Sequence, residues 1–409
     1  MHNQDFIICV SHTSWDGVYQ KPAVQLMTEL ASRHRVLFVD YQYTVKDLAL
    51  GIVGLKKVPV RQVLRLKNPL VRKMLANGAE LHVWVPPLAL VVNWMPDAWH
   101  DYFMKWNTTW LLKSLRKAMS RVDADAKRPL IINSFNPVWG LSMLGQLNER
   151  GTIYYCYDEI TAEKWIARHG GRYERDYLPK VDAVVTTSET LQSAKGQLQP
   201  NAFCVKNGAN YDLFSQARQL ALTADREQKI VGYLGTADNR LDLNLLEYCL
   251  KNLPDVLFQF IGRVTDSTVT DRLASYANVE FIKPVPPDEL PPLLARLRVG
   301  IIPFQCNEHT YTIYPLKINE YLAAGIPVIS TRFSILNDFD GLIELTNDPA
   351  QFVAGIRAAS TAVSPDRVEQ FTRTAETNSW VRKALEFEEV IQQVLRSKSE
   401  GREWKAALN

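Results

Sequence analysis

Residues 314–330 read YPLKINEYLAAGIPVIS, a pattern that predicts a helix followed directly by a strand. The helix is expected to begin at Pro315, where the missing proline N–H costs no hydrogen bond, and to end at Gly325. The apolar residues 326–330 then predict the strand. At the helix start, the N–H groups of residues 316–318 lack partners within the helix. Together with the positive end of the helix dipole, they form a site for an anion such as a diphosphate.

Two side chains of this helix suit a nucleotide. Lys317 adds a positive charge beside the expected anion site. Glu320, one turn further along, has a carboxylate that can accept two hydrogen bonds from the vicinal hydroxyls of a ribose. An ordinary helix–strand connection with a lysine and a glutamate on its surface explains the same residues equally well, because helix N-termini are common. From these residues alone, both interpretations stay open.

The alternation of helix and strand extends in both directions from this segment. Short continuous apolar runs, typical of strands buried on both faces, recur along the chain. They lie at 6–10, 35–39, 81–85, 130–132, 153–156, 183–187 and 202–205, and then at 230–234, 257–261, 279–281, 299–303 and 326–330. The pattern predicts an α/β chain with two mostly parallel, doubly wound sheets. We expect a first domain over residues 1–215, a second over 229–375, and a last helix within 376–409 that packs back toward the first domain.

The composition fits a globular enzyme in a reducing compartment. The chain has 409 residues, a formal net charge of +3 and five cysteines with no Cys-x-x-Cys pair. Neither a disulfide framework nor a metal site is predicted, and the charge is too low for a dedicated nucleic-acid binder. The N-terminal residues lack a basic region followed by a long apolar stretch, and prolines interrupt the most apolar window, 81–95. We therefore expect a cytoplasmic protein with neither a signal peptide nor a membrane span.

Motifs along nearly the whole chain resemble those of GT-B glycosyltransferases of the group 1, or family 4, kind. Residues 315–329 resemble the donor-site signature of that family. Other matching segments follow the same order: Trp15 with 20–22, YYCYDE at 154–159, TSE at 187–189, NGAN at 207–210, GYLG at 232–235, IGR at 261–263 and SW at 379–380. The branch that the chain resembles is the teichuronic-acid-biosynthesis type of bacterial polysaccharide glycosyltransferase.

This resemblance implies a fold and an activity. The fold would be GT-B, with two Rossmann-like domains facing each other across a cleft. The activity would be transfer of a hexose-type sugar, with retention of its anomeric configuration, from a nucleoside-diphosphate-sugar to a glycan or a polyprenyl-linked acceptor. The role would be bacterial cell-surface polysaccharide synthesis, with no cofactor and no metal ion.

The family's motifs also imply roles for individual residues at the donor site. Glu320 matches the second glutamate of the family's E-x7-E motif, which holds the donor ribose. Thr312 stands at the position of the first glutamate, so contacts to the sugar fall to Thr312 or its neighbours within 308–312. The implied donor set also includes Tyr314, Pro315, Leu316 and Lys317.

Further donor contacts are implied after the strands of the second domain. Gly235 and Thr236 resemble the loop that approaches the phosphates, where glycine has no Cβ to block the ligand. Arg240 and Arg263 would supply cations to the diphosphate, although ion pairs with nearby aspartates are the alternative for each. Val285 resembles the position whose backbone meets the base.

Three side chains of the first domain are candidate catalytic residues. Asp158 and Glu159 directly follow a strand, at the end where α/β folds place working carboxylates, and either is suited to bind the acceptor or to act as a base. His12 follows the first strand, where many such enzymes have an acceptor-side loop. A carboxylate that caps the next helix and a purely structural histidine are the alternatives.

Residues 47–113 depart from the alternation of helix and strand. Basic and apolar residues interleave from 56 to 73, and five tryptophans follow, namely Trp84, Trp94, Trp99, Trp106 and Trp110. Such an insertion can rest on an anionic membrane surface, at the inner face of the plasma membrane, or hold a lipid-linked acceptor. An ordinary pair of amphipathic helices with a solvated charged face is the alternative.

Two other functions remain open on the sequence. A nucleotide-sugar epimerase of the same fold would need no acceptor. A non-catalytic protein that binds nucleotide sugars or glycans would fit if the change at Thr312 abolished turnover.

Overall fold

The computed structural model describes residues 4–17, 21–123, 128–162, 166–224, 227–361 and 363–400. The chain divides into two compact units. The first contains the N-terminal residues to Gly17, residues 21–205 and the chain from Ala384 onward, whereas the second spans 206–383. The boundary thus lies between Val205 and Lys206, earlier than the expected residue 215. Residues 401–409 of the expected last segment lie outside the described ranges.

The first unit is built on an eight-stranded sheet in the order β3-β4-β2-β1-β5-β6-β7-β8. Its strands are β1 (Phe6–Ser11), β2 (Arg35–Val39), β3 (Leu70–Met74), β4 (Glu80–Trp84), β5 (Leu130–Ser134), β6 (Gly151–Cys156), β7 (Ala183–Thr186) and β8 (Ala202–Cys204). All neighbours are parallel except β3, which runs antiparallel to β4 at one edge. Because helices cover both faces, the inner strands are buried along their whole length, and this explains their continuous apolar sequences.

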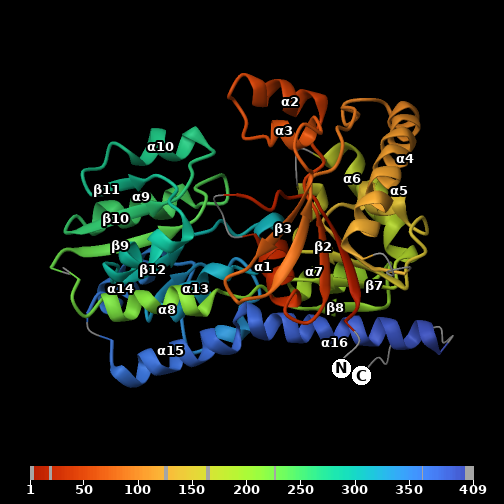
Figure 1. The fold of residues 1–409 in the computed structure, drawn as a ribbon. Helices are drawn as coiled ribbons and strands as arrows, with labels where there is room; N and C mark the ends of the chain where they lie inside the picture. Colours follow the sequence, from red (N-terminus) through yellow and green to blue (C-terminus); the bar gives the residue numbers. More distant parts are fainter. Residues whose placement is uncertain are drawn as a thin grey trace. The chain divides into compact units, whose positions relative to one another are not determined.

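Helices cover both faces of this sheet (Figure 1). They are α1 (Pro22–Leu30), α4 (Asp97–Val122), α5 (Pro137–Met143), α6 (Ala167–Tyr177), α7 (Glu189–Gly196) and most of α16 (Trp380–Ser399), with 3-10 turns at Ile160–Ala162 and Leu178–Lys180. Helices α2 (Val45–Ile52) and α3 (Val60–Val63) lie beyond the strand ends instead (Figure 1). Leu111 and Leu115 of α4 join the core of one face with Ile8. On the other face, the Phe387 ring of α16 lies edge-on to Tyr155 at 5.6 Å.

The insertion at 47–113 is not a simple pair of helices. Helices α2 and α3 lead into a β-hairpin, β3 and β4, in which Leu70 pairs with Trp84. The long helix α4 then follows. The alternative of an ordinary amphipathic helical pair is therefore wrong. Strand β3 joins the edge of the sheet through backbone hydrogen bonds, and the sequence of this half-exposed pentapeptide, which contains a lysine and an arginine, does not indicate a strand.

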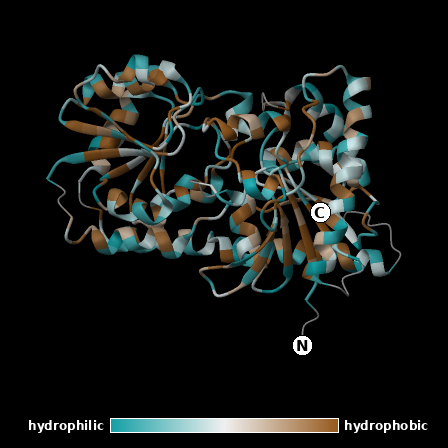
Figure 2. Ribbon diagram, turned by 45° about the horizontal axis from the view of Figure 1, so that its top comes forward, coloured by the Kyte–Doolittle hydropathy of each residue, from teal (hydrophilic) through white to brown (hydrophobic). Residues whose placement is uncertain are grey.

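The second unit is built on a six-stranded parallel sheet in the order β11-β10-β9-β12-β13-β14. Its strands are β9 (Lys229–Leu234), β10 (Val256–Ile261), β11 (Val279–Ile282), β12 (Val299–Ile302), β13 (Val328–Ser330) and β14 (Glu344–Leu345). Its helices are α8 (Tyr211–Leu220), α9 (Leu243–Asn252), α10 (Ser267–Leu273), α11 (Leu290–Ala295), α12 (Glu308–Tyr311), α13 (Leu316–Ala323), α14 (Pro349–Ala359) and α15 (Pro365–Thr377), with 3-10 turns at Pro287–Glu289 and Asn337–Phe339. Figure 2 shows the strands mostly in hydrophobic colours. The expected α/β fold with two Rossmann-like sheets is confirmed.

A single tyrosine fixes α13 against the sheet of the second unit. Tyr321 is fully buried, and its hydroxyl accepts a hydrogen bond from the N–H of Leu234 (2.6 Å) and donates one to the carbonyl of Gly232 (3.0 Å). Gly300 of β12 leaves room for the ring, since a Cβ there would lie 2.7 Å from ring atoms. The side chain therefore sets the distance between α13 and the end of β9.

We predict that Tyr321→Phe lowers the free energy of unfolding by about 1–3 kcal/mol, because two buried backbone groups on β9 lose their partner. Urea denaturation of the full chain measures the change. Tyr248→Phe, at a tyrosine that is 40% exposed on α9, is the matched control and should shift the value by less than about 0.5 kcal/mol. Equal effects of the two substitutions would show that the Tyr321 hydroxyl does not hold the helix.

Candidate functional site

A cavity of about 220 Å³ in the second unit lies at the carboxyl ends of β9 and β10. Open parallel sheets place their ligands at this edge. The cavity is lined by Phe214, Leu234, Gly235, Thr236, Ile261, Gly262, Pro284, Val285, Pro287, Leu290, Leu316, Lys317 and Glu320. The structure thus brings six of the expected donor residues together, Gly235, Thr236, Val285, Leu316, Lys317 and Glu320.

Two glycines bring the backbone of both strand ends into contact. Gly235 has φ 137° and Gly262 has φ 145°, conformations that side chains with a Cβ rarely adopt. A Cβ on Gly235 would collide with the Lys317 side chain, and a Cβ on Gly262 would collide with the Gly235 carbonyl. Both positions therefore require glycine, and the close approach leaves the cavity floor as bare backbone. Sequence reasoning selected Gly235 but missed Gly262.

The start of α13 differs from the expectation in one respect. Pro315 is the N-cap, with φ −81° and ψ 102°, and the helix begins at Leu316. As a result, the N–H of Ile318 already bonds to the Pro315 carbonyl at 3.2 Å and is not free. Within the described part of the chain, no acceptor takes the N–H of Leu316 or Lys317. Two backbone donors, rather than three, are available to an anion.

Lys317 and Glu320 form an electrostatic pair inside the cavity. Burial lowers the pKa of Lys317, and nearby Arg240 lowers it further. Burial raises the pKa of Glu320, partly offset by the positive charge of Lys317. For both groups burial disfavours the charged form, because it excludes water and the opposite charge of the partner compensates only partly. An anion beside Lys317 would raise its pKa again, because it stabilises the ammonium form.

The two expected arginines do not line this cavity. Arg240 makes a two-pronged contact with Asp238, with Nε–Oδ1 at 2.8 Å and Nη2–Oδ2 at 2.6 Å, and its guanidinium lies over Phe304. The alternative of an ion pair with a nearby aspartate therefore holds for Arg240, with Asp238 as the partner and not Asp242, which caps α9. Arg263 also lies outside the cavity lining, and its carbonyl accepts the Ala237 N–H at 2.8 Å.

The residues before α13 are mostly held in structural contacts. The Tyr314 ring is buried against Phe339, and its hydroxyl is 3.2 Å from Asp338. Thr310 is fully buried and completes the capping box of α12, so it is not available to a sugar. The Thr312 hydroxyl donates to the His309 carbonyl at 2.8 Å. Neither Thr312 nor Tyr314 lines the cavity.

In the first unit, His12 contacts Tyr157, the residue directly before the two candidate carboxylates. Its Nδ1 is 3.1 Å from the Tyr157 hydroxyl, and its ring lies edge-on to Phe135 at 5.6 Å. Burial, and then the charge of Lys21, lower the pKa of His12 to about 4, so the imidazole is neutral near pH 7. Phe135 is buried at a left-handed φ of 53°, a costly conformation that bulky residues adopt mainly at functional sites.

Glu159 is held in a buried ion-pair network. Lys195 donates to Glu159 at 2.8 Å and to Glu174 at 2.7 Å. The other Glu159 oxygen accepts the N–H and hydroxyl of Thr161. Although burial opposes it, this network holds the pKa of Glu159 below its usual value. The ionised carboxylate therefore fixes the loop after β6, and Asp158 accepts the Glu159 N–H at 2.9 Å.

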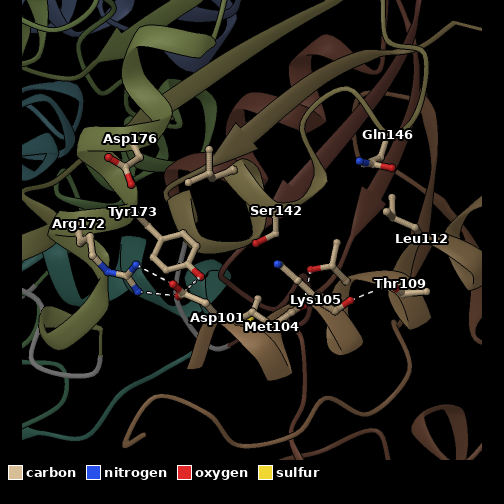
Figure 3. Close-up of a pocket in the computed structure, with 12 residues that line it drawn as sticks. Asp101, Met104, Lys105, Thr109, Leu112, Ser142, Gln146, Arg172, Tyr173 and Asp176 are labelled. Carbon is tan, nitrogen blue, oxygen red and sulfur yellow. Dashed lines mark hydrogen bonds and ion pairs between the residues drawn. The ribbon is translucent and has the colours of Figure 1, made fainter. Parts of the chain in front are cut away.

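A larger cavity of about 630 Å³ lies between α4, α5 and α6 in the same unit (Figure 3). Its charged groups neutralise one another: both Asp101 oxygens accept from the Arg172 guanidinium, at 2.7 and 2.9 Å, and the Tyr173 hydroxyl donates to Asp101 at 2.8 Å. These contacts hold the pKa of Asp101 well below its usual value, with the Arg172 hydrogen bonds as the main cause. The arrangement is typical of a structural brace between helices rather than of a reacting site.

The described ranges contain no group of three or more His, Cys, Asp or Glu side chains positioned to hold a metal ion. They also contain no helix that is both long and apolar enough to cross a membrane.

Comparisons with known proteins point to one family and one fold. Residues 228–361 match the family model described as "Glycosyl transferases group 1". The putative teichuronic acid biosynthesis glycosyltransferase TuaH of Bacillus subtilis (strain 168) is 32% identical over 166 residues, which are 38% of this chain and 41% of TuaH. The match therefore spans less than half the length of this relative.

Solved structures resemble the chain over nearly its whole length. Sucrose-phosphate synthase from Thermosynechococcus elongatus has a TM-score of 0.67 at 14% identity, covering 96% of this chain and 100% of its own. Trehalose 6-phosphate synthase from Burkholderia multivorans has a TM-score of 0.66 at 11% identity, with 97% and 99% covered. HepE from Anabaena, solved with UDP and glucose, has a TM-score of 0.59 at 12% identity, with 94% and 99% covered.

These likenesses establish the GT-B fold. The family match covers the unit that carries the cavity between β9, β10 and α13. Residues 228–361 are thus similar to the group 1 glycosyltransferases, and the chain as a whole has the GT-B fold.

Proposed function

We propose that the chain is a glycosyltransferase that moves a sugar from a nucleoside-diphosphate-sugar to a glycan or lipid-linked acceptor in bacterial cell-surface polysaccharide synthesis. The observation that carries the proposal is the position of Lys317 and Glu320 in one cavity, floored by Gly235 and Gly262. A cation, two backbone donors and a buried carboxylate at this spacing suit a diphosphate joined to a ribose.

Each part of the proposed donor contacts a different set of residues in the cavity. The diphosphate lies against the free N–H groups of Leu316 and Lys317 and the Lys317 ammonium. The ribose hydroxyls donate to Glu320, and the base packs on the apolar side formed by Pro284, Val285 and Leu290. Arg240, whose charge already acts on Lys317, adds to the positive potential that offsets the leaving diphosphate.

We propose that transfer proceeds with retention and without a protein nucleophile. The leaving diphosphate itself takes the proton of the incoming hydroxyl. His12, neutral at physiological pH, positions the acceptor through a hydrogen bond instead of storing a proton. Asp158 remains a candidate acceptor contact, whereas Glu159 acts as a positioning residue through its ion pair with Lys195.

Release of nucleoside diphosphate from a panel of nucleotide sugars, with and without a polyprenyl-linked acceptor, tests the function. We expect release that depends on the acceptor for one donor. Change of the donor sugar without an acceptor would instead identify an epimerase. Binding with no release under any condition would identify a non-catalytic protein and overturn the proposal.

Substitutions in the cavity should separate its two contacts. We expect Lys317→Met to weaken both inorganic pyrophosphate and nucleoside diphosphates by about tenfold or more, because an ammonium–phosphate contact is lost. Glu320→Ala should weaken nucleoside diphosphates but not pyrophosphate, because only the ribose contact is lost. Calorimetry measures both, with Lys251→Met, an exposed lysine on α9, as the control.

The same calorimetry has a pH signature. Since a bound diphosphate raises the lowered pKa of Lys317, binding takes up a proton, and the affinity of the wild-type protein should fall as the pH rises from about 7 to about 9. Lys317→Met should lose this dependence. A variant that retains it, or that binds pyrophosphate normally, would show that Lys317 does not contact the phosphates.

We also propose that the enzyme works in the cytoplasm, on the inner face of the plasma membrane, through α4. Trp99, Tyr102, Trp106 and Trp110 are all more than half exposed and recur every three or four residues, so they share one face of the helix. The exposed cations Lys113, Lys117 and Arg121 continue this face. Aromatic side chains followed by basic ones suit the headgroup region of anionic lipids.

The segment 56–73 contributes less to this contact than its composition indicates. Lys56 pairs with Asp47, Arg72 pairs with Glu80, and Lys73 lies 2.9 Å from Asp16. Arg65 donates to the Val85 carbonyl and lies over Trp84, which is buried. These charges are engaged within the unit, so we assign the membrane contact to α4.

Co-sedimentation with vesicles that contain anionic lipid tests this assignment. We expect a Trp99→Ser, Trp106→Ser, Trp110→Ser variant to lose most of the bound fraction, because its interfacial aromatic surface is gone. Neutralising Lys56, Lys57, Arg61 and Arg65 should have the smaller effect. Unchanged partitioning of the tryptophan variant would show that α4 does not contact the membrane.

A further inference from the structure

A second polar cavity, of about 850 Å³, lies within the first unit. Its lining comes from the residues that follow β1 and β2, from the end of β4, and from the insertion that contains α2, α3 and β3. In Figure 1, α2 and α3 lie above these strands. The cavity therefore occupies the carboxyl edge of three neighbouring strands, β4, β2 and β1, where α/β sheets bind their ligands.

The charge of this cavity is positive and not fully neutralised. Five lysines line it against two aspartates, Asp16 and Asp40: Lys21, Lys56, Lys57, Lys67 and Lys73. Lys56 and Lys73 have carboxylate partners, as described above, and Lys21 donates to the Ser14 carbonyl at 2.7 Å. The side-chain ammonium groups of Lys57 and Lys67, by contrast, form no ion pair or hydrogen bond with any described residue, and both side chains are exposed.

The cations of this cavity suit a compact, multiply charged anion. All five basic side chains are lysines, and no arginine contributes to the described lining. A lysine ammonium acts as a point charge with three donors and can contact the tetrahedral oxygens of a phosphate, although arginine binds phosphates as well. Two uncompensated lysines match a group that carries two or more negative charges.

The rest of the lining suits a sugar. Tyr41 and Tyr43 present an edge-to-face aromatic pair with ring centroids 5.1 Å apart, and the Lys56 ammonium lies over the Tyr41 ring. His12 lines the same cavity. The volume lies in the range of small-molecule sites and exceeds what one phosphate fills, so a larger molecule with a phosphate group fits.

We infer that this cavity binds the acceptor through a phosphate or diphosphate group, held by Lys57 and Lys67, with the sugar of the acceptor directed toward His12. The identification of the ligand as the acceptor rests on the proposed transferase function, whereas the phosphate site does not depend on that function. The phosphate can come from a soluble sugar phosphate or from the diphosphate of a lipid-linked glycan.

Binding without turnover tests the site directly. Inorganic pyrophosphate is titrated by calorimetry into the full chain carrying Lys317→Met, so that the nucleotide cavity of the second unit contributes little. We expect Lys57→Gln with Lys67→Gln, added to this background, to weaken the remaining binding about 10- to 100-fold, because two charged contacts are lost. Repeating the titration with Lys317 intact and the donor site filled by UDP guards against an effect of the background substitution.

The matched control is Lys180→Gln with Lys251→Gln, which removes the same charge from exposed positions at the end of the Leu178–Lys180 turn and on α9. This pair should leave pyrophosphate binding unchanged. Equal loss in the two double variants would show that only net charge matters, and full binding in the Lys57 and Lys67 variant would place the anion elsewhere. Either result overturns the inference.

Transfer assays distinguish the sources of the phosphate. We expect the double variant to raise the acceptor KM, with the donor KM unchanged, for a soluble sugar phosphate or for a polyprenyl-diphosphate-linked sugar in vesicles, whichever the enzyme accepts. Equal use of a phosphorylated acceptor and its phosphate-free form would contradict the inference. If pyrophosphate binds through Lys57 and Lys67 but no donor is ever turned over, the transferase proposal fails while the phosphate site remains.

Discussion

The cavity at the start of α13 depends on the two hydrogen bonds that the buried Tyr321 hydroxyl makes with β9. They fix α13 at a distance where the Lys317 side chain passes directly over Gly235. Position 262 must then be glycine, because a Cβ there would collide with the Gly235 carbonyl. Both strand ends are therefore without side chains. The fixed position of α13 therefore brings the N-terminal N–H groups of the helix, the Lys317 ammonium and the Glu320 carboxylate to one small cavity.

Most of the fold could be predicted because parallel strands buried on both faces have continuous apolar sequences, as in β1 and β6. Strand β3 could not, because an edge strand is stabilised by its neighbour's backbone and its side chains are half exposed. The same limit applies to tryptophan: Trp84 and Trp99 look alike in the sequence, yet one is buried in the sheet and the other lies on the surface. Burial of an aromatic residue depends on its tertiary neighbours.

The site was predictable where a local motif carries it and not where distant segments meet. Lys317 and Glu320 share one helix start, so spacing alone places them together. Gly262 and Tyr321 matter only through contacts across the sheet, which no local pattern encodes. Glu159 shows a limit of the local pattern, because a carboxylate after a strand is equally suited to catalysis or to a buried ion pair. Its partner Lys195 comes from a helix later in the chain.

Phe135 shows that this unit is not selected for stability alone. A residue with a left-handed backbone at φ 53° costs roughly 1–2 kcal/mol for a side chain other than glycine or asparagine. The bulky ring is nevertheless kept there, 4.6 Å from the Tyr157 ring and edge-on to His12. Glycine would relax the backbone but leave a hole beside the imidazole. The chain thus keeps a residue that lowers its stability next to His12, as proteins do where the geometry of a site matters more than the free energy of unfolding.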